Sequence, residues 1–208
     1  MKIIKLMALA AILMPLLFSC SGGGSSAGML GQLPDKYAQF TEEKAELKKE
    51  AENIKTEADK KRFLEKSEKL NKKWKEKLEA TAKDLNGKPI EFAESQFEVT
   101  SPVSLEFEEF SSESALTPRF KVNGEAKAAS DITIDQKYYS TENVYITGYD
   151  AEGKQVYKAK VGSVEVQDAD GKLLVKAGTP VKFDKLGFGK ADVEGSKLAK
   201  SYKLEMVR

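Results

Sequence analysis

The sequence predicts an α+β protein in which a charged helical segment over residues 35–86 precedes an antiparallel β-sandwich over residues 87–208. Residues 35–86 contain no glycine or proline and are dominated by Lys, Glu, Ala and Leu, a composition that favours helix. Gly87 and Pro89 then end the helical pattern. Beyond them, apolar and polar residues alternate with a period of two, which is typical of half-buried strands.

The first twenty residues have the organisation of an export signal. Lys2 and Lys5 provide a positive start, Ile3 to Phe18 is almost wholly apolar, and Leu17-Phe18-Ser19-Cys20 closes the segment. The segment resembles the signal peptide of bacterial lipoproteins, whose lipobox is a Leu, two positions that favour small residues, and a Cys. Phe18 is bulkier than is usual in that box. The resemblance implies removal of residues 1–19 and lipidation of Cys20.

A transmembrane helix and an ordinary cleaved signal are the alternatives for this segment. The apolar run is shorter than the ~20 residues that a bilayer span needs, and Pro15 interrupts it. Cys20 is the only cysteine, so an intrachain disulfide is impossible. We therefore expect the membrane as a partner, through a lipid anchor at Cys20. The resemblance implies the periplasmic face of the outer membrane, with cell-surface exposure as the second choice. Surface-export signals of some bacteria place acidic residues directly after the cysteine, whereas the first acidic residue here is Asp35.

Residues 20–34 are predicted to be a flexible linker. The run Ser21 to Gly28 consists of Ser, Gly and Ala, and its eight residues would span a root-mean-square distance of ~15–17 Å. Met29 to Pro34 continues the linker, and Pro34-Asp35 is a helix-start signal.

The helical segment is predicted to fold as a hairpin of two helices, at about 35–54 and 57–85. Phe40, Leu47 and Ile54 recur every seven residues, as in a coiled coil, and the apolar stripe then changes phase. The second stripe consists of Phe63, Leu64, Leu70, Trp74, Leu78 and Leu85. Thr56 with Asp59 forms a helix-start signal between the two halves. A single kinked helix is the alternative.

About eight or nine short strands are expected in residues 87–208, and their turns are predicted from Asn123-Gly124, Asp150 to Gly153 and Asp168 to Gly171. The last strand is expected to include Leu198, and no helix is expected between strands. The run Tyr149-Asp150-Ala151-Glu152-Gly153-Lys154 resembles a hairpin of the immunoglobulin-like modules of exported bacterial proteins. That resemblance implies an immunoglobulin-like sandwich.

Several kinds of chemistry are excluded by composition. The chain has no histidine, which removes Ser-His and Cys-His nucleophile pairs and imidazole metal sites. Without residues 1–19 the chain has 34 − 2 = 32 basic and 33 acidic residues, a formal charge of −1. This balance predicts no nucleic-acid partner and no broad basic patch. We expect no cofactor and no metal, since Asp168, Asp170 and Gly171 lack the further oxygen ligands of a calcium loop.

The sequence therefore predicts a lipid-anchored, noncatalytic binding, scaffold or assembly module of the cell envelope. The alternative is a carboxylate-dependent hydrolase acting on a glycan, for which the candidate acids are Glu106, Glu108, Glu109 and Glu113. The candidate partner surface consists of Leu70, Trp74, Leu78, Tyr145 and Tyr149, and the helices could bind an envelope protein or self-associate. Further exposed aromatics would be Tyr138, Tyr139 and Phe188. Burial in a core is the competing interpretation for all these apolar residues.

Overall fold

The computed structural model describes residues 28–134, 140–169, 172–188 and 190–206. The predicted signal peptide, Cys20 and most of the tether lie outside the described residues, as do Tyr138 and Tyr139. Among the residues that are described, no helix has both the length and the apolar character needed to cross a membrane.

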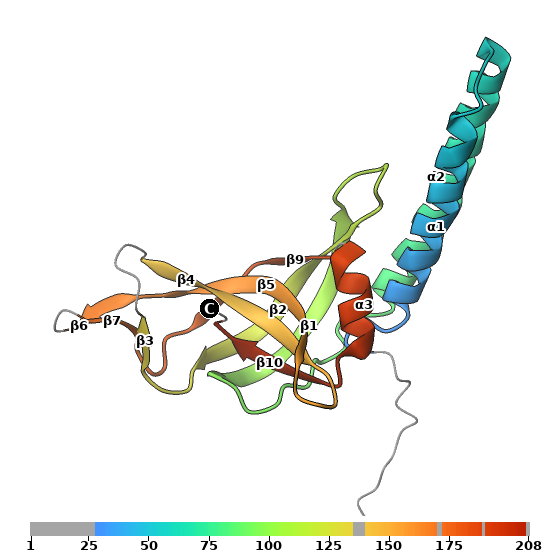
Figure 1. Ribbon diagram of the computed structural model, residues 1–208. Coiled ribbons are helices and arrows are strands. Elements are labelled where there is room, and N and C mark those ends of the chain that lie inside the picture. Colours follow the sequence, from blue (N-terminus) through green and yellow to red (C-terminus); the bar gives the residue numbers. More distant parts are fainter. Residues whose placement is uncertain (1–27, 135–139, 170–171, 189, 207–208) are drawn as a thin grey trace, which may run out of the picture.

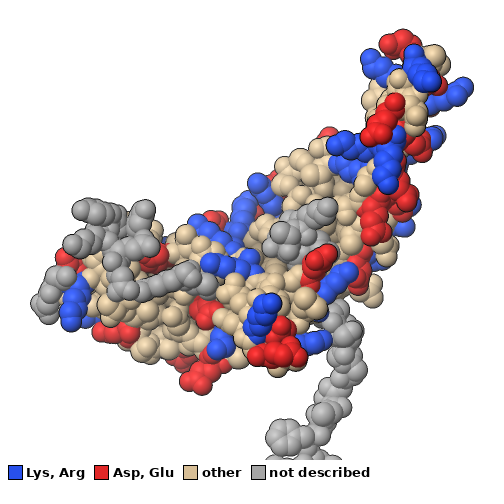
Figure 2. All heavy atoms as spheres, in the orientation of Figure 1, with Lys and Arg blue, Asp and Glu red and all other residues tan. Residues whose placement is uncertain are grey.

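The charged segment forms the predicted hairpin, which projects from the β-rich part of the molecule (Figure 1). Helix α1 spans Leu33–Ala51 and helix α2 spans Glu57–Lys83, so the single-helix alternative is wrong. The predicted cap at the start of α2 is confirmed: the Thr56 hydroxyl accepts a hydrogen bond from the Asp59 N–H, and the Asp59 carboxylate accepts one from the Thr56 N–H, both at 3.1 Å. Acidic and basic side chains are interspersed over the surface of the hairpin (Figure 2).

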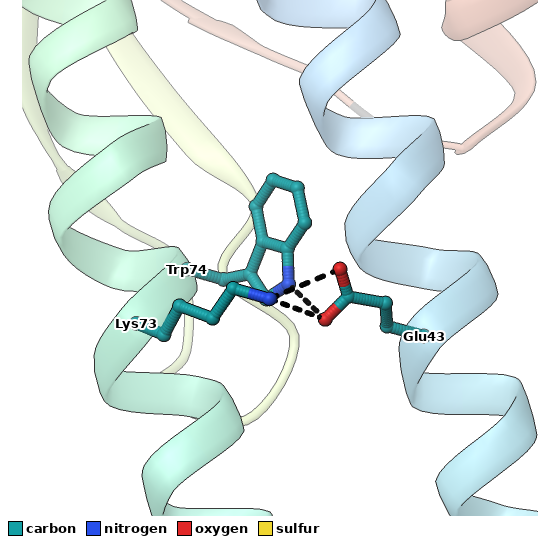
Figure 3. A network of polar contacts seen from close by, with 3 residues as sticks. All are labelled: Glu43, Lys73 and Trp74. Atoms are coloured by element: carbon teal, nitrogen blue, oxygen red, sulfur yellow. Dashed lines mark hydrogen bonds and ion pairs between the residues drawn. The ribbon is translucent and has the colours of Figure 1, made fainter.

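A polar network joins the two helices at their middle (Figure 3). The Glu43 carboxylate accepts hydrogen bonds from the Lys73 ammonium at 2.8 Å and from the Trp74 indole N–H at 2.9 Å. These two donors, Lys73 first, lower the pKa of Glu43 because they favour its charged form. The network satisfies the one polar atom of an otherwise buried tryptophan.

In the described residues, the β-rich part contains three antiparallel sheets, which confirms the α+β class. The first has the order β1-β2-β9, the second β10-β4-β5-β8 and the third β3-β7-β6. In chain order, the strands are β1 Phe97–Phe110, β2 Pro118–Ala128, β3 Ile132–Ile134, β4 Thr141–Tyr149, β5 Gln155–Glu165, β6 Gln167–Ala169, β7 Lys172–Val175, β8 Val181–Phe183, β9 Lys185–Gly187 and β10 Ser201–Glu205.

Backbone hydrogen bonds join the first and second sheets on both sides. On one side, Asp184 lies between β8 and β9; its N–H donates to the Val161 carbonyl at 2.8 Å, and its carbonyl accepts from the Val122 N–H at 3.2 Å. On the other side, the segment 86–96 runs between the edge strands β1 and β10. It bonds to both, through Ile90 N–H to a carbonyl of β1 and Ala93 N–H to a carbonyl of β10, each at 2.8 Å. The two sheets therefore enclose one core in a barrel-like arrangement.

A short helix, α3 at Lys190–Leu198, interrupts the strands and corrects the prediction that no helix lies among them. Leu198, expected in the last strand, ends this helix with 56% of its surface exposed. Gly195 lets α3 approach β5 closely, because a Cβ atom there would lie 2.0 Å from the Val156 carbonyl oxygen. Nine residues that include a glycine produce too short a periodic pattern to be recognised as a helix in the sequence.

One predicted turn is wrong. Asn123 and Gly124 lie inside β2, at a shift in its pairing with β1, and not between two strands. Gly124 has φ +129°, and a Cβ atom there would lie 2.7 Å from the Pro102 carbonyl oxygen, so glycine is needed for a β-bulge. The loop between β1 and β2 is instead residues 111–117, where Leu116 has φ +47°.

The turn at Asp150 is confirmed, since its carboxylate accepts hydrogen bonds from the N–H groups of Glu152 and Lys154. In the third sheet, Ala169 pairs with Lys172, and the connecting residues 170 and 171 lie outside the described part of the chain.

The base of the helical hairpin belongs to the same hydrophobic core as the strands. Trp74 is 2% exposed and Leu78 is fully buried, whereas Leu70 is half-buried against that core. The predicted partner surface is therefore wrong for Trp74 and Leu78, which pack inside this chain. Phe188 is buried as well, with its ring edge-on to that of Tyr37 at 5.6 Å. Leu64 is 52% exposed, so it does not belong to the predicted seam.

Because Leu78 belongs to the core that the helices and strands share, we expect Leu78→Ala to destabilise the whole molecule. The change should lower the free energy of unfolding by ~2–5 kcal/mol. Unfolding in denaturant, followed by Trp74 fluorescence for the hairpin and by circular dichroism for the strands, should show one lowered midpoint with both probes. The exposed Leu64→Ala is the control and should change stability by less than about 0.5 kcal/mol. Separate midpoints would show that the hairpin and the strands unfold independently.

Candidate binding face

The outer face of the second sheet carries the two tyrosines predicted from the sequence. In β4, Val144 and Ile146 are fully buried, so the alternating residues Tyr145, Thr147 and Tyr149 lie on the opposite face. Tyr145 and Tyr149 therefore share the face away from the core, where both are half-buried. We call this surface the tyrosine face and define it by Tyr145, Thr147, Tyr149, Lys158, Lys160, Lys203 and Glu205.

The pairing of β10, β4 and β5 arranges the tyrosine face in rows that cross the three strands. The middle row is Lys203, Thr147 and Lys158. The row on one side of it is Glu205, Tyr145 and Lys160. Tyr149 stands in the row on the other side of the middle row. Each tyrosine is therefore the β4 residue of a row that adjoins the middle row, which contains Lys158 and Lys203.

The two lysines of the middle row lie over tyrosine rings at opposite ends of the face. The Lys158 ammonium is 4.3 Å from the centroid of the Tyr145 ring, and the Lys203 ammonium is 5.4 Å from that of Tyr149. Both distances fall within the range of cation–π contacts. Within the described part of the chain, neither these lysines nor Lys160 forms an ion pair with a carboxylate.

Tyr149 donates a hydrogen bond to the Glu205 carboxylate. The negative charge that accepts this bond, together with burial, raises the pKa of Tyr149 to about 12, since both favour the neutral phenol. Glu205 stands opposite Tyr145, so the Tyr149 side chain must extend past Thr147 to reach it. Thr147 is fully buried on this outer face, and its hydroxyl has no hydrogen-bond partner within the described structure.

The outer side of the first sheet has a different arrangement, in which cations of β2 and β9 pair with the predicted acidic cluster on β1. Glu108 forms an ion pair with Lys185 at 2.7 Å, and Glu109 forms one with Arg119 at 3.8 Å. Glu106 accepts a hydrogen bond from Asn123 at 3.1 Å. The carboxylate of Glu108 raises the pKa of Lys185. Three of the four candidate catalytic acids thus have polar partners, and Glu113 lies exposed in the loop 111–117.

Sequence reasoning did not find the groove between the segment 85–93 and the start of β10, which has a volume of about 610 Å³. Its lining includes Met29, Leu85, Ile90, Phe92, Ala93 and Tyr202. It forms where an irregular segment meets an edge strand, a contact between distant parts of the chain that has no local sequence signal.

Asp168 stands in β6, not in a loop, and Asp170 and Gly171 lie outside the described residues. The described part of the chain holds no group of three acidic residues placed to bind a metal ion.

No family model, curated protein or solved structure matches this chain. Any function must therefore be inferred from the residues themselves, and the tyrosine face is a surface whose lysines have no carboxylate partner in the described part of the chain.

Because Glu205 raises the pKa of Tyr149, Glu205→Gln should lower that pKa toward the ordinary value of 10. The raised pKa stabilises the folded protein below pH 10, and this contribution disappears as the pH rises through about 12. Phenolate absorbance measured against pH, with Tyr149→Phe to identify the signal of this residue, checks the change. Glu106→Gln, on the other sheet, should leave the titration unaltered. An unchanged curve for Glu205→Gln would contradict the hydrogen bond.

Proposed function

We propose that the protein is a lipid-anchored, noncatalytic binding module of the bacterial cell envelope, and that the tyrosine face is its binding surface. The observation that carries the second part is the difference between Lys158 and Lys203 and the paired cations on the same two sheets. Arg119, Lys127 and Lys185 on the first sheet and Lys182 on the second pair with carboxylates. Lys158 and Lys203 instead lie over aromatic rings without a carboxylate partner among the described residues. Cations without an internal partner remain available to a ligand.

The folded part begins only a few residues after the proposed lipid anchor, which supports a role close to a membrane. The N–H of Met29 donates to the Tyr202 hydroxyl at 3.0 Å, and Leu30 and Leu33 are buried in the core. The proposed lipid at Cys20 would thus be joined to the folded part through only eight residues, Ser21 to Gly28, with a root-mean-square span of ~15–17 Å. A tether of this length would hold the module near the bilayer.

The helical hairpin is proposed as an arm of the module, not as its partner-binding surface. Its widest apolar part, around Trp74 and Leu78, is already buried against the strands. The distal part carries the half-buried Leu47, Ile54 and Phe63 in addition to the exposed Leu64, too few to form a second core. We therefore do not propose self-association through Leu70, Trp74 and Leu78.

The immunoglobulin-like character of the strands stays a prediction. So does the choice between the periplasmic and the outer face of the outer membrane. The hydrolase alternative gains no support from Glu106, Glu108 and Glu109, because each of these acids has a polar partner on its own sheet.

For the anchor, we expect Cys20→Ser to abolish lipidation and to shift the protein from the membrane fraction to the soluble fraction. The measurement is fractionation of cells with mass spectrometry of the N-terminus. The neighbouring change Ser21→Ala is the control and should leave the protein acylated. Membrane association of an unlipidated Cys20→Ser protein would show that another part of the chain holds it there.

For the binding surface, a photoreactive amino acid in place of Tyr145 should crosslink to a defined envelope component in intact cells. The same amino acid in place of Glu106 is the matched control, since it lies on the exposed side of the other sheet. Crosslinks from position 145 alone support the tyrosine face. Equal crosslinks from both positions, or from position 106 alone, would contradict it.

A further inference from the structure

We infer that the ligand of the tyrosine face is an acidic glycan, meaning a chain of sugars that carries carboxylate groups. This inference rests on the proposed function of the face. Its three lysines, Lys158, Lys160 and Lys203, outnumber its single acid, Glu205, so the face has a local charge of 3 − 1 = +2. The mature chain as a whole has a formal charge of −1, so positive charge is concentrated here. Positive charge attracts an anionic ligand.

The composition of the face argues against a protein as its main partner. All its cations are lysines, a residue depleted in protein–protein interfaces, whose centres are apolar and favour arginine. Tyr145, Thr147 and Tyr149 are the β4 residues of the face, and none of them is aliphatic. Tyrosine is common in such interfaces, but the centre of this face is Thr147 between two lysines and not an apolar cluster.

The position of Glu205 favours a glycan over a uniformly anionic surface as the ligand. Its carboxylate lies within the positive face, on β10 opposite Tyr145, where it would repel phosphates or lipid headgroups but can accept hydrogen bonds from sugar hydroxyls. Lys203, its neighbour on β10, and Lys158 and Lys160, two strands away on β5, can pair with the carboxylates of the same glycan. A lysine lies over one face of each tyrosine ring, and the other face can attract the weakly positive C–H groups of a sugar ring.

The buried hydroxyl of Thr147 supplies an independent observation. It lies at the centre of the middle row, between Lys158 and Lys203, fully buried and without a partner in the described structure. Leaving a buried hydroxyl unpaired is costly, so such groups need an explanation. A ligand that hydrogen-bonds to the Glu205 carboxylate in place of Tyr149 would release the Tyr149 side chain. Thr147 would then be uncovered, and its hydroxyl could form a hydrogen bond with the ligand.

The test uses the full chain carrying Cys20→Ser and measures its retardation in native gels that contain polygalacturonate, a polymer of acidic sugars. Dextran is the neutral sugar control, polyglutamate is the acidic polymer without sugar, and vesicles of phosphatidylglycerol in phosphatidylcholine, tested by co-sedimentation, represent an anionic membrane. We expect binding to polygalacturonate, at least tenfold weaker binding to polyglutamate, and none to dextran or vesicles. Trp74 fluorescence confirms that each variant is folded.

Matched variants separate the site from general charge. Lys158→Gln with Lys203→Gln should weaken polygalacturonate binding at least tenfold. Lys127→Gln with Lys185→Gln removes the same charge from the first sheet, where both lysines lie in ion pairs, and should leave binding within twofold. Thr147→Val should weaken binding severalfold while raising the unfolding midpoint, because it removes an unpaired buried hydroxyl. A purely structural threonine would not produce that combination.

Several outcomes would overturn the inference. The inference fails if the Lys158/Lys203 variant and the Lys127/Lys185 variant lose polygalacturonate binding equally, or if Thr147→Val binds polygalacturonate unchanged. It also fails if polyglutamate or the vesicles bind as strongly as polygalacturonate. Each result would show that the face does not recognise an acidic glycan. In each of these cases, a specific crosslink from position 145 would still support the proposed binding face. If none of the probes binds and position 145 gives no specific crosslink, the proposed function fails together with the inference.

Discussion

The burial of the hairpin base against the strands is the contact on which the rest of the structure depends. Trp74 and Leu78 of α2 are covered by α1 on one side and belong to the core of the strands on the other. The ring of Phe40 lies 6.1 Å from that of Trp74, and Tyr37 in turn contacts Phe188 next to the last strands. Helices with so narrow an apolar stripe gain most of their stability from such packing. The core therefore joins two parts that the sequence presents as separate segments.

This shared core also explains why the hairpin is a poor candidate for partner binding. The free part of the arm is stabilised by its cap at Thr56 and by exposed ion pairs such as that of Lys66 with Glu50 at 2.5 Å. Exposed pairs of this kind contribute little to stability or to recognition. The network of Glu43 differs because it satisfies the indole N–H of the buried Trp74, so it supports the core although Glu43 and Lys73 are partly exposed.

The lysines on the outer sides of the two larger sheets have two kinds of partner. On the first sheet, cross-strand pairing places opposite charges together, as for Lys127 and Glu98 at 3.4 Å. On the second sheet, Lys182 pairs with Glu165 in the same way, but Lys158 and Lys203 lie over the tyrosine rings of β4. Cation–π contact does not neutralise a lysine, whereas an ion pair does so locally. The tyrosine face consequently keeps a positive charge that can act on other molecules.

Much of this architecture could be predicted from local patterns. Composition and the Thr56 signal predicted the hairpin, and alternation along β4 indicated that Tyr145 and Tyr149 share one face, because periodicity is a property of neighbouring residues. Other features depend on residues far apart in the chain. Asn123-Gly124 has the local chemistry of a turn, yet it becomes a bulge because Gly124 must pass close to Pro102 on the paired strand.

The burial of Trp74 and the meeting of Lys158, Lys203 and Glu205 around β4 likewise follow from the packing and pairing of distant segments. The sequence by itself determined which faces are apolar or polar. Only the tertiary structure decided which of those faces are covered and which charges find a partner, since burial and ion pairing depend on the register of strands separated by long stretches of chain.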